Sequence, residues 1–179
     1  MSSLLYSTFS LTNLFLTVYI SVTGVDLLAL PGLQASTAQT ILAEIGLDMK
    51  KWPNEKAFCA WLGLAPRHEI SGGKVLRRHT LKTHNRAGQA LRLVAQAAGR
   101  SASGLGAFYR RMRARLGPQS AIVATAHKIA RIIYHMLTHR TPFRDLSPEE
   151  YTRRTRAREM TALRKKAARL GLTVVEGQA

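Results

Sequence analysis

A small hydroxyl side chain stands on a glycine-rich turn within residues 70–92. Ser71 is followed directly by two glycines, and the whole stretch has no Asp or Glu. A serine Oγ can attack a phosphodiester when cations surround the phosphorus, and glycines let a nucleic-acid backbone come close. Phosphodiester chemistry at Ser71 is therefore expected. The predicted nucleic-acid contacts of this stretch are Gly72, Gly73, Lys74, Arg77, Arg78, Lys82, Asn85, Arg86 and Arg92.

The charge of the chain is strongly positive and unevenly distributed. The sequence has 27 Lys or Arg against 10 Asp or Glu, which gives a formal net charge of +17. Residues 70–144 contain 15 basic residues and no acidic one. This distribution indicates a polyanionic partner, nucleic acid first and an acidic membrane surface second. With about six to ten phosphate contacts, affinity should fall roughly 10³- to 10⁵-fold between about 50 and 200 mM salt.

Two other groups of residues could meet phosphate. The Pro31-Gly32 turn precedes an amphipathic segment that ends at Gly46, which resembles a helix-hairpin-helix; the alternative is a hairpin that only packs. A cluster of arginines between residues 110 and 115 forms either a phosphate contact or a solvated face. The lack of nearby acids favours phosphate, so Gly32, Arg110 and Arg111 are predicted contacts.

Metal and thiol chemistry find little support in the sequence. His135 and His139 have the i, i+4 spacing of a metal pair, but no third ligand is evident, and a solvent-facing stripe is favoured. The single Cys59 excludes an internal disulfide and a cysteine-based zinc site, and it fits a reducing cytoplasm. No metal ligands are predicted.

Local signals predict helices around the serine stretch. Asn54 and Gly63 are the expected N-cap and C′ residues of a helix that buries Phe58, Trp61 and Leu62. Later caps and apolar periodicity predict helices over residues 85–100, 103–116, 119–139 and 147–170. In the third of these, Lys128 and Arg131 are expected on the solvent-facing side. The serine stretch itself lacks helical periodicity, so a short hairpin or an extended loop is expected there.

The predicted fold class is mainly α. It comprises a helix-hairpin-helix-like start, a short hairpin or loop carrying the serine, and a helical bundle with a basic C-terminal helix. The expected divisions are a poorly defined segment over 1–25, a central domain over 26–145 and a basic helical arm over 146–179. Residues 1–25 have no charged side chain and many Ser and Thr, so neither a signal peptide nor a membrane helix is predicted.

Four blocks occur in order along residues 27–143: LPGLQASTAQTILAEIG, AFCAWLGLAPRHEISGGK, NRAGQALR and AIVATAHKIARIIYHML. Together they resemble the C-terminal transposase domain of the DEDD-type insertion-sequence transposases, a family that includes the bridge-RNA-guided recombinases. The resemblance implies that Ser71 attacks DNA and that Lys82, Asn85 and Arg86 represent a phosphate-contacting block. It also implies DNA as partner, a guide RNA, a homo-oligomer, no membrane and a cytoplasmic location.

The sequence departs from that family at its N-terminal side. Family members carry a RuvC-like domain in which four carboxylates hold a divalent metal. The acids before Ser71 do not match such a tetrad: Asp26, Glu44, Asp48, Glu55 and Glu69. The chain is therefore expected to be a truncated copy that holds no cofactor, with Mg²⁺ supplied only through the missing domain. The alternative is a non-catalytic nucleic-acid-binding remnant; a ribosomal-type protein would explain the charge but not the four blocks.

Overall fold

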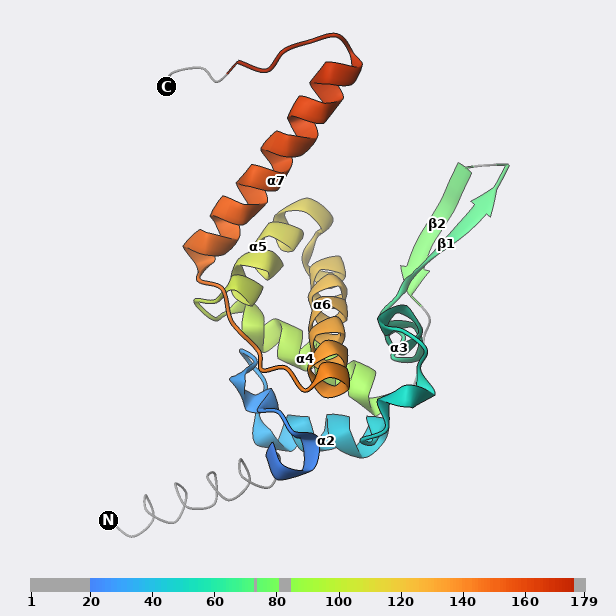
Figure 1. Cartoon of the computed structure of the whole chain (residues 1–179). Helices are drawn as coiled ribbons and strands as arrows, with labels where there is room; N and C mark the ends of the chain where they lie inside the picture. Colours follow the sequence, from blue (N-terminus) through green and yellow to red (C-terminus); the bar gives the residue numbers. More distant parts are fainter. Residues whose placement is uncertain (1–19, 73, 81–84, 176–179) are drawn as a thin grey trace.

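The computed structural model describes residues 20–72, 74–80 and 85–175 (Figure 1). The chain is mainly helical, which confirms the predicted fold class. A two-stranded antiparallel hairpin interrupts the helices, as expected for the serine stretch. The elements in chain order are η1 (Leu27–Ala29), α2 (Ala35–Ile45), η2 (Met49–Lys51), α3 (Glu55–Trp61), β1 (Pro66–Ser71), β2 (Lys74–Thr80), α4 (Arg86–Gly99), α5 (Gly104–Leu116), α6 (Pro118–His139) and α7 (Pro148–Arg169).

Side-chain caps fix where four of the described α-helices begin. Asn54, Asn85, Ser103 and Ser147 precede α3, α4, α5 and α7 respectively. Each side-chain oxygen accepts a hydrogen bond from the backbone N–H three residues later, at 2.9 to 3.1 Å. Such a bond satisfies one of the donors that a helix start leaves without a partner. The predicted caps at Asn54, Asn85 and Ser147 are confirmed.

Helix α4 runs through the middle of the body and packs against α2, α5 and α6 (Figure 1). Its inward face is built largely from alanine, with Leu91 and Val94 as the larger buried side chains. Helix α6 brings Ile129, Ile133 and Met136 into the same core, and α3 adds Phe58. Small residues on α4 let the neighbouring helices approach closely, so the helical elements from η1 to α6 contribute to one core.

Two expectations about burial are wrong. Trp61 was expected in the core but is 39% exposed, because the chain leaves α3 at this point and only one side of the indole packs on Trp52 and Phe58. Lys128 was expected in solvent but is half-buried, because α5 and α7 bring two aromatic rings over its side chain. Arg131, the other expected solvent-facing residue, is exposed.

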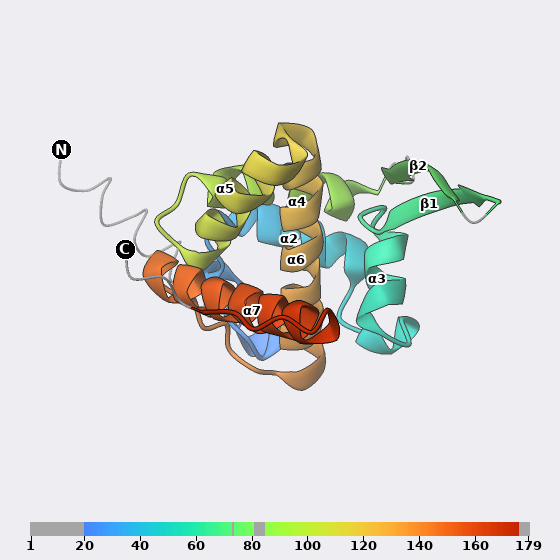
Figure 2. The same cartoon turned by 90° about the horizontal axis from the view of Figure 1, so that it is seen from above.

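The hairpin and α7 both extend from the helical body. The hairpin follows α3 and projects away from the other helices in both views (Figures 1 and 2). Helix α7 crosses α5 and has no buried residue, while the predicted division into a separate arm over 146–179 stays a prediction. Its contact with α5 includes an ion pair between Arg111 and Glu159.

Residues 1–19 of the poorly defined N-terminal segment lie outside the described residues. Residues 20–23 are helical, and Val25 is buried in the same core as Leu27 and Leu30. Among residues 20–72, 74–80 and 85–175, no helix is long and apolar enough to cross a membrane.

Gly32 offers a test of the close packing between the first turn and α4. A Cβ built on Gly32 would lie 2.6 Å from the backbone nitrogen of Ala98, and its φ is +82°. Gly117 has nearly the same φ, +81°, but nothing lies within 4 Å of its Cβ position. Gly117→Ala should therefore lower the free energy of unfolding by about 1 kcal/mol, from backbone strain alone.

Gly32→Ala should lower it by about 3 kcal/mol, because overpacking against α4 is added to that strain. Urea unfolding of both variants measures the difference. Equal losses in the two variants would mean that α4 does not approach the Pro31-Gly32 turn as closely as the structure indicates.

Candidate nucleic-acid interface

Ser71 lies at the tip of the hairpin and is exposed. It is the last residue of β1, and Gly72 follows with a φ of +55° and open space around its Cβ position. A two-residue turn of this kind requires left-handed backbone, which glycine adopts without strain. Ser71 therefore stands exposed on a projecting element, next to a glycine with open space around it.

The strand register places basic residues opposite β1. Ser71 pairs with Lys74, Glu69 with Arg77, and His68 with Arg78. A register shift after Glu69 leaves Leu76 as an additional residue on β2, so the two halves of the hairpin follow slightly different registers. Lys74 is thus the basic residue directly across the strand pair from Ser71. The side chains of Lys74, Arg77 and Arg78, and residues Gly73 and Lys82, lie outside what the structure describes.

Residues in the first two turns of α4 contact the end of α3, just before the hairpin begins. The Asn85 side chain caps α4 and also donates from Nδ2 to the Trp61 carbonyl at 3.5 Å. Arg92 Nη2 donates to the Gly63 carbonyl at 3.0 Å. A Cβ on Gly88 would lie only 2.2 Å from the carbonyl oxygen of Leu62. These residues hold the root of the hairpin in place.

Asn85 and Arg92 therefore both have structural roles. The cap at Asn85 was predicted from the sequence, but the bond from Arg92 to the Gly63 carbonyl was not. Both were predicted as nucleic-acid contacts, and no observation tests that prediction. Arg86, by contrast, is exposed at the first residue of α4, and no described residue forms an ion pair or hydrogen bond with its side chain. Of the three, Arg86 has the guanidinium that is free to meet a phosphate.

Arg110 and Arg111 also bind within the chain. Arg110 Nη1 donates to the carbonyls of Gly99 at 3.3 Å and Ser101 at 3.2 Å, at the end of α4. A hydrogen bond with Tyr151, together with the ion pair to Glu159, raises the pKa of Arg111. Cations near a helix C-terminus are favourable because they complement its free carbonyls. Both side chains are still exposed, so a phosphate contact remains a prediction for them.

Gly32 has a packing role as well. Its left-handed backbone and its approach to Ala98 explain why a glycine follows Pro31. Helix α2 begins without a side-chain cap, since Gln34 makes no capping hydrogen bond. Phosphate binding by this turn and its resemblance to a helix-hairpin-helix stay predictions.

The histidines and the cysteine show no metal site in the described part of the chain. The rings of His135 and His139 lie 4.5 Å apart on the exposed side of α6, and His135 Nδ1 is 3.1 Å from Thr141 Oγ1. No three His, Cys, Asp or Glu residues gather among residues 20–72, 74–80 and 85–175. Cys59 is buried in the core, and this burial raises the pKa of its thiol to about 11, so the thiol is a poor nucleophile.

Residues 26–110 match the model of the transposase IS116/IS110/IS902 family. The transposase-like segment, as these residues are called below, runs from η1 into α5 and includes the whole hairpin with Ser71. The similarity supports a transposase or recombinase role and an interaction with DNA. No curated protein matches the chain.

The transposase-like segment contains most of the predicted contacts but not all of the basic surface. The sequence reasoning missed Lys128, Arg131 and the surface between α6 and α7, which the structure brings next to Phe143 and Tyr151. Lys128, Arg131 and His135 are spaced to share one face of a helix, and this spacing was the signal that could have indicated the surface. The aromatic residues come from segments far along the chain, and only tertiary structure places them there.

Substitutions of Asn85 can separate capping from nucleic-acid contact. Asn85→Ala should lower the free energy of unfolding by about 1 kcal/mol, because the Gly88 N–H loses its partner. Asn85→Ser should lose less stability than Asn85→Ala, because Ser is an equally good N-cap and only the weak Nδ2 contact with the Trp61 carbonyl is lost. Chemical unfolding of the two variants checks this, and equal losses would contradict the capping role. Nucleic-acid binding by the Ser variant, which is uncharged like the wild type at this position, then reports whether the amide itself contacts the ligand.

Proposed function

We propose that residues 26–145 are the DNA-cutting and DNA-joining domain of an insertion sequence, with Ser71 as the nucleophile. One observation carries the proposal: the segment that matches the transposase family holds an exposed serine at the tip of a projecting hairpin. The excess of basic residues supports DNA as the partner. A guide RNA, a homo-oligomer and a cytoplasmic location belong to the same proposal.

The proposed reaction transfers a phosphodiester bond to the serine and back. Ser71 Oγ forms a bond to a DNA phosphorus while the bond from that phosphorus to one strand oxygen breaks. The proton of the hydroxyl is lost to solvent or to a base, and the departing oxygen gains a proton. Attack on the resulting phosphoserine by a hydroxyl of another strand reverses the step, so the bond energy is conserved and no nucleotide cofactor is consumed.

Residues near the hairpin tip supply charge to this reaction. Lys74 stands directly opposite Ser71 in the strand register, and Arg77 and Arg78 follow on the same strand. Cations around the phosphorus stabilise the additional negative charge that develops in the transition state. Gly72 and Gly73 lack side chains that would keep the DNA backbone away.

The metal that the family resemblance implies does not fit the described residues. Because no three potential ligands gather in the described part of the chain, we derive no step through a metal. We propose instead that Mg²⁺ is held by a RuvC-like domain that works together with this one. The second candidate function, a nucleic-acid-binding remnant without chemistry, draws support from the excess of basic residues, which nucleic-acid binding alone would explain.

A covalent-trapping assay separates the two functions. The purified chain is incubated with labelled DNA that carries the element's end junction, with and without Mg²⁺, associated RNA and a RuvC-like domain. Denaturing gels then reveal any protein–DNA adduct. We expect an adduct in the wild type that is lost completely in Ser71→Ala, because the attacking oxygen is removed.

Ser120→Ala is the matched control, because Ser120 is also exposed but lies in the first turn of α6. Its adduct should equal that of the wild type. An adduct that survives in Ser71→Ala would assign the chemistry to another residue. Binding without any adduct under all conditions would favour the non-catalytic remnant.

A further inference from the structure

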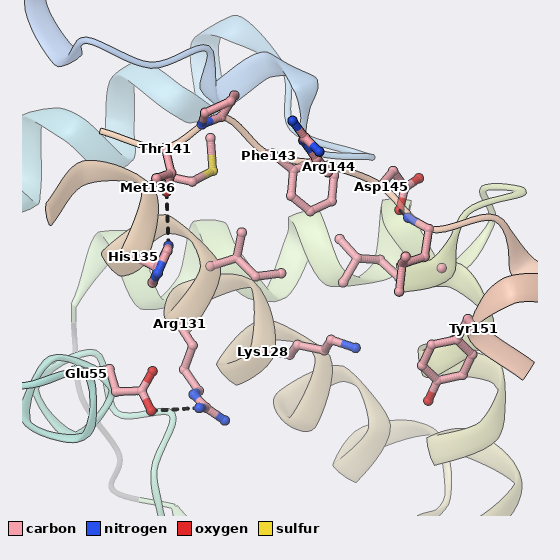
Figure 3. A pocket seen from close by; sticks show the side chains of 15 residues that line it. Glu55, Lys128, Arg131, His135, Met136, Thr141, Phe143, Arg144, Asp145 and Tyr151 are labelled. Carbon is pink, nitrogen blue, oxygen red and sulfur yellow. Dashed lines mark hydrogen bonds and ion pairs between the residues drawn. The ribbon is translucent and has the colours of Figure 1, made fainter. Parts of the chain in front are cut away.

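A groove follows α6 from the foot of the hairpin to the start of α7. Its larger part has a volume of about 570 Å³ and lies between α6, the segment after α6 and α7 (Figure 3). The smaller part, about 410 Å³, lies beside Pro66 at the foot of the hairpin. Glu55 and Arg131 line both parts, so the two hollows adjoin at this ion pair.

Lys128 is the central cation of the larger part. Its side chain is half-buried, and Nζ lies 4.2 Å from the ring centroid of Phe108 and 5.1 Å from that of Tyr151. Burial, and then the charge of Arg158, lower the pKa of the Lys128 ammonium, while the charge of Asp145 opposes this. No carboxylate in the described part of the chain lies close enough to form an ion pair with it. Because a half-buried charge without a directly paired counter-charge is unfavourable, an anionic ligand would supply the contact that Asp145 does not make.

The other charges of the groove also favour an anion. Arg131 Nη2 lies 2.7 Å from Glu55 Oε1, so the one carboxylate shared by both parts is already neutralised. Asp145 accepts a hydrogen bond from the N–H of Leu146. Lys56 adds a further cation to the smaller part, and Arg144 adds one to the larger part. The lining therefore has more cations than carboxylates along its whole length.

The floor of the larger part is mostly apolar and includes flat rings. Met136 comes from α6, and Phe143 lies on the segment that follows it (Figure 3). Ile132 of α6 also lines this part. Tyr151 closes the far end from α7. Alternating cations and aromatic surfaces in one groove are typical of sites for unpaired nucleotides, because the cations meet phosphates and the rings stack on bases.

We propose that this groove binds an unpaired stretch of nucleic-acid strand. Lys128 contacts a phosphate, and Phe143 and Tyr151 receive the adjoining bases. The inference rests on the proposed function, since it takes the strand to come from DNA engaged by the hairpin. The groove begins at the hairpin foot, so a strand held by the hairpin can continue into it after local unpairing.

Binding of a fluorescent single-stranded oligonucleotide of thymidines tests the role of Lys128. Lys128→Met keeps an apolar stem over the two rings but removes the charge. It should weaken binding about fivefold and reduce the slope of log affinity against log salt by about 0.7, the share of one single-strand phosphate contact. The matched control is Arg113→Gln, which removes an equal charge from an exposed position on α5 outside the groove. Its affinity and slope should stay near those of the wild type.

Thermal unfolding distinguishes binding from a purely structural role of Lys128. The Tm of Lys128→Met should stay the same or rise, because an unpaired half-buried charge is removed. A lower Tm with unchanged affinity would mean that the ammonium only ties α5 to α7 through the rings, and would overturn the proposal. Affinities are compared at a temperature where all variants are folded.

Photo-crosslinking locates the bases. Oligonucleotides with 5-iodouracil should crosslink to Phe143 or Tyr151, and Phe143→Leu should weaken binding about tenfold through lost stacking. Crosslinks confined to other surfaces would contradict the groove. These readouts need no covalent adduct at Ser71, so failure of the proposed chemistry and failure of the groove are separate outcomes.

Discussion

The approach of α4 to the end of α3 is the contact on which the rest of the structure depends. Gly88 allows it, since any side chain there would collide with the Leu62 carbonyl. Asn85 and Arg92 then bind the carbonyls of Trp61 and Gly63, which satisfies backbone groups at the end of a short helix. By backbone contacts among the described elements, β1 and β2 lie chiefly against each other. The direction of the hairpin, and with it the position of Ser71, therefore follows from this one junction.

The basic side chains divide into two groups with different physical roles. One group closes helix ends or pairs with acids of the chain, as Arg110 and Arg111 do. The other group pairs with no acid and closes no helix end among the described residues, as in Arg86 and Lys128. Net charge alone does not separate the two groups, because both contribute equally to the total of +17. The unpaired cations are the ones that give the surface its attraction for a polyanion.

The hairpin, the groove and α7 suggest how a small domain can engage a long ligand. A projecting hairpin brings a hydroxyl to the nucleic acid without requiring a cleft, and the groove begins where the hairpin joins the body. Helix α7 lies along the far side of that groove, and most of its cations face solvent. The groove along α6 thus connects the foot of the hairpin that carries Ser71 with the proposed strand site. Each of the two proposals rests on separate observations.

The sequence by itself determined the local structure. Caps at Asn54, Asn85 and Ser147, the Gly117-Pro118 break and the glycines after Ser71 predicted where helices start and where the hairpin turns, because these signals act over only a few residues. Tertiary structure alone decided whether side chains at the border of a helix's buried face are buried or exposed, as Trp61 and Lys128 show. It also decided that Arg92 holds Gly63 and that Phe143 and Tyr151 meet Lys128. Those contacts join residues far apart in the chain, and their energies depend on packing that no local pattern contains.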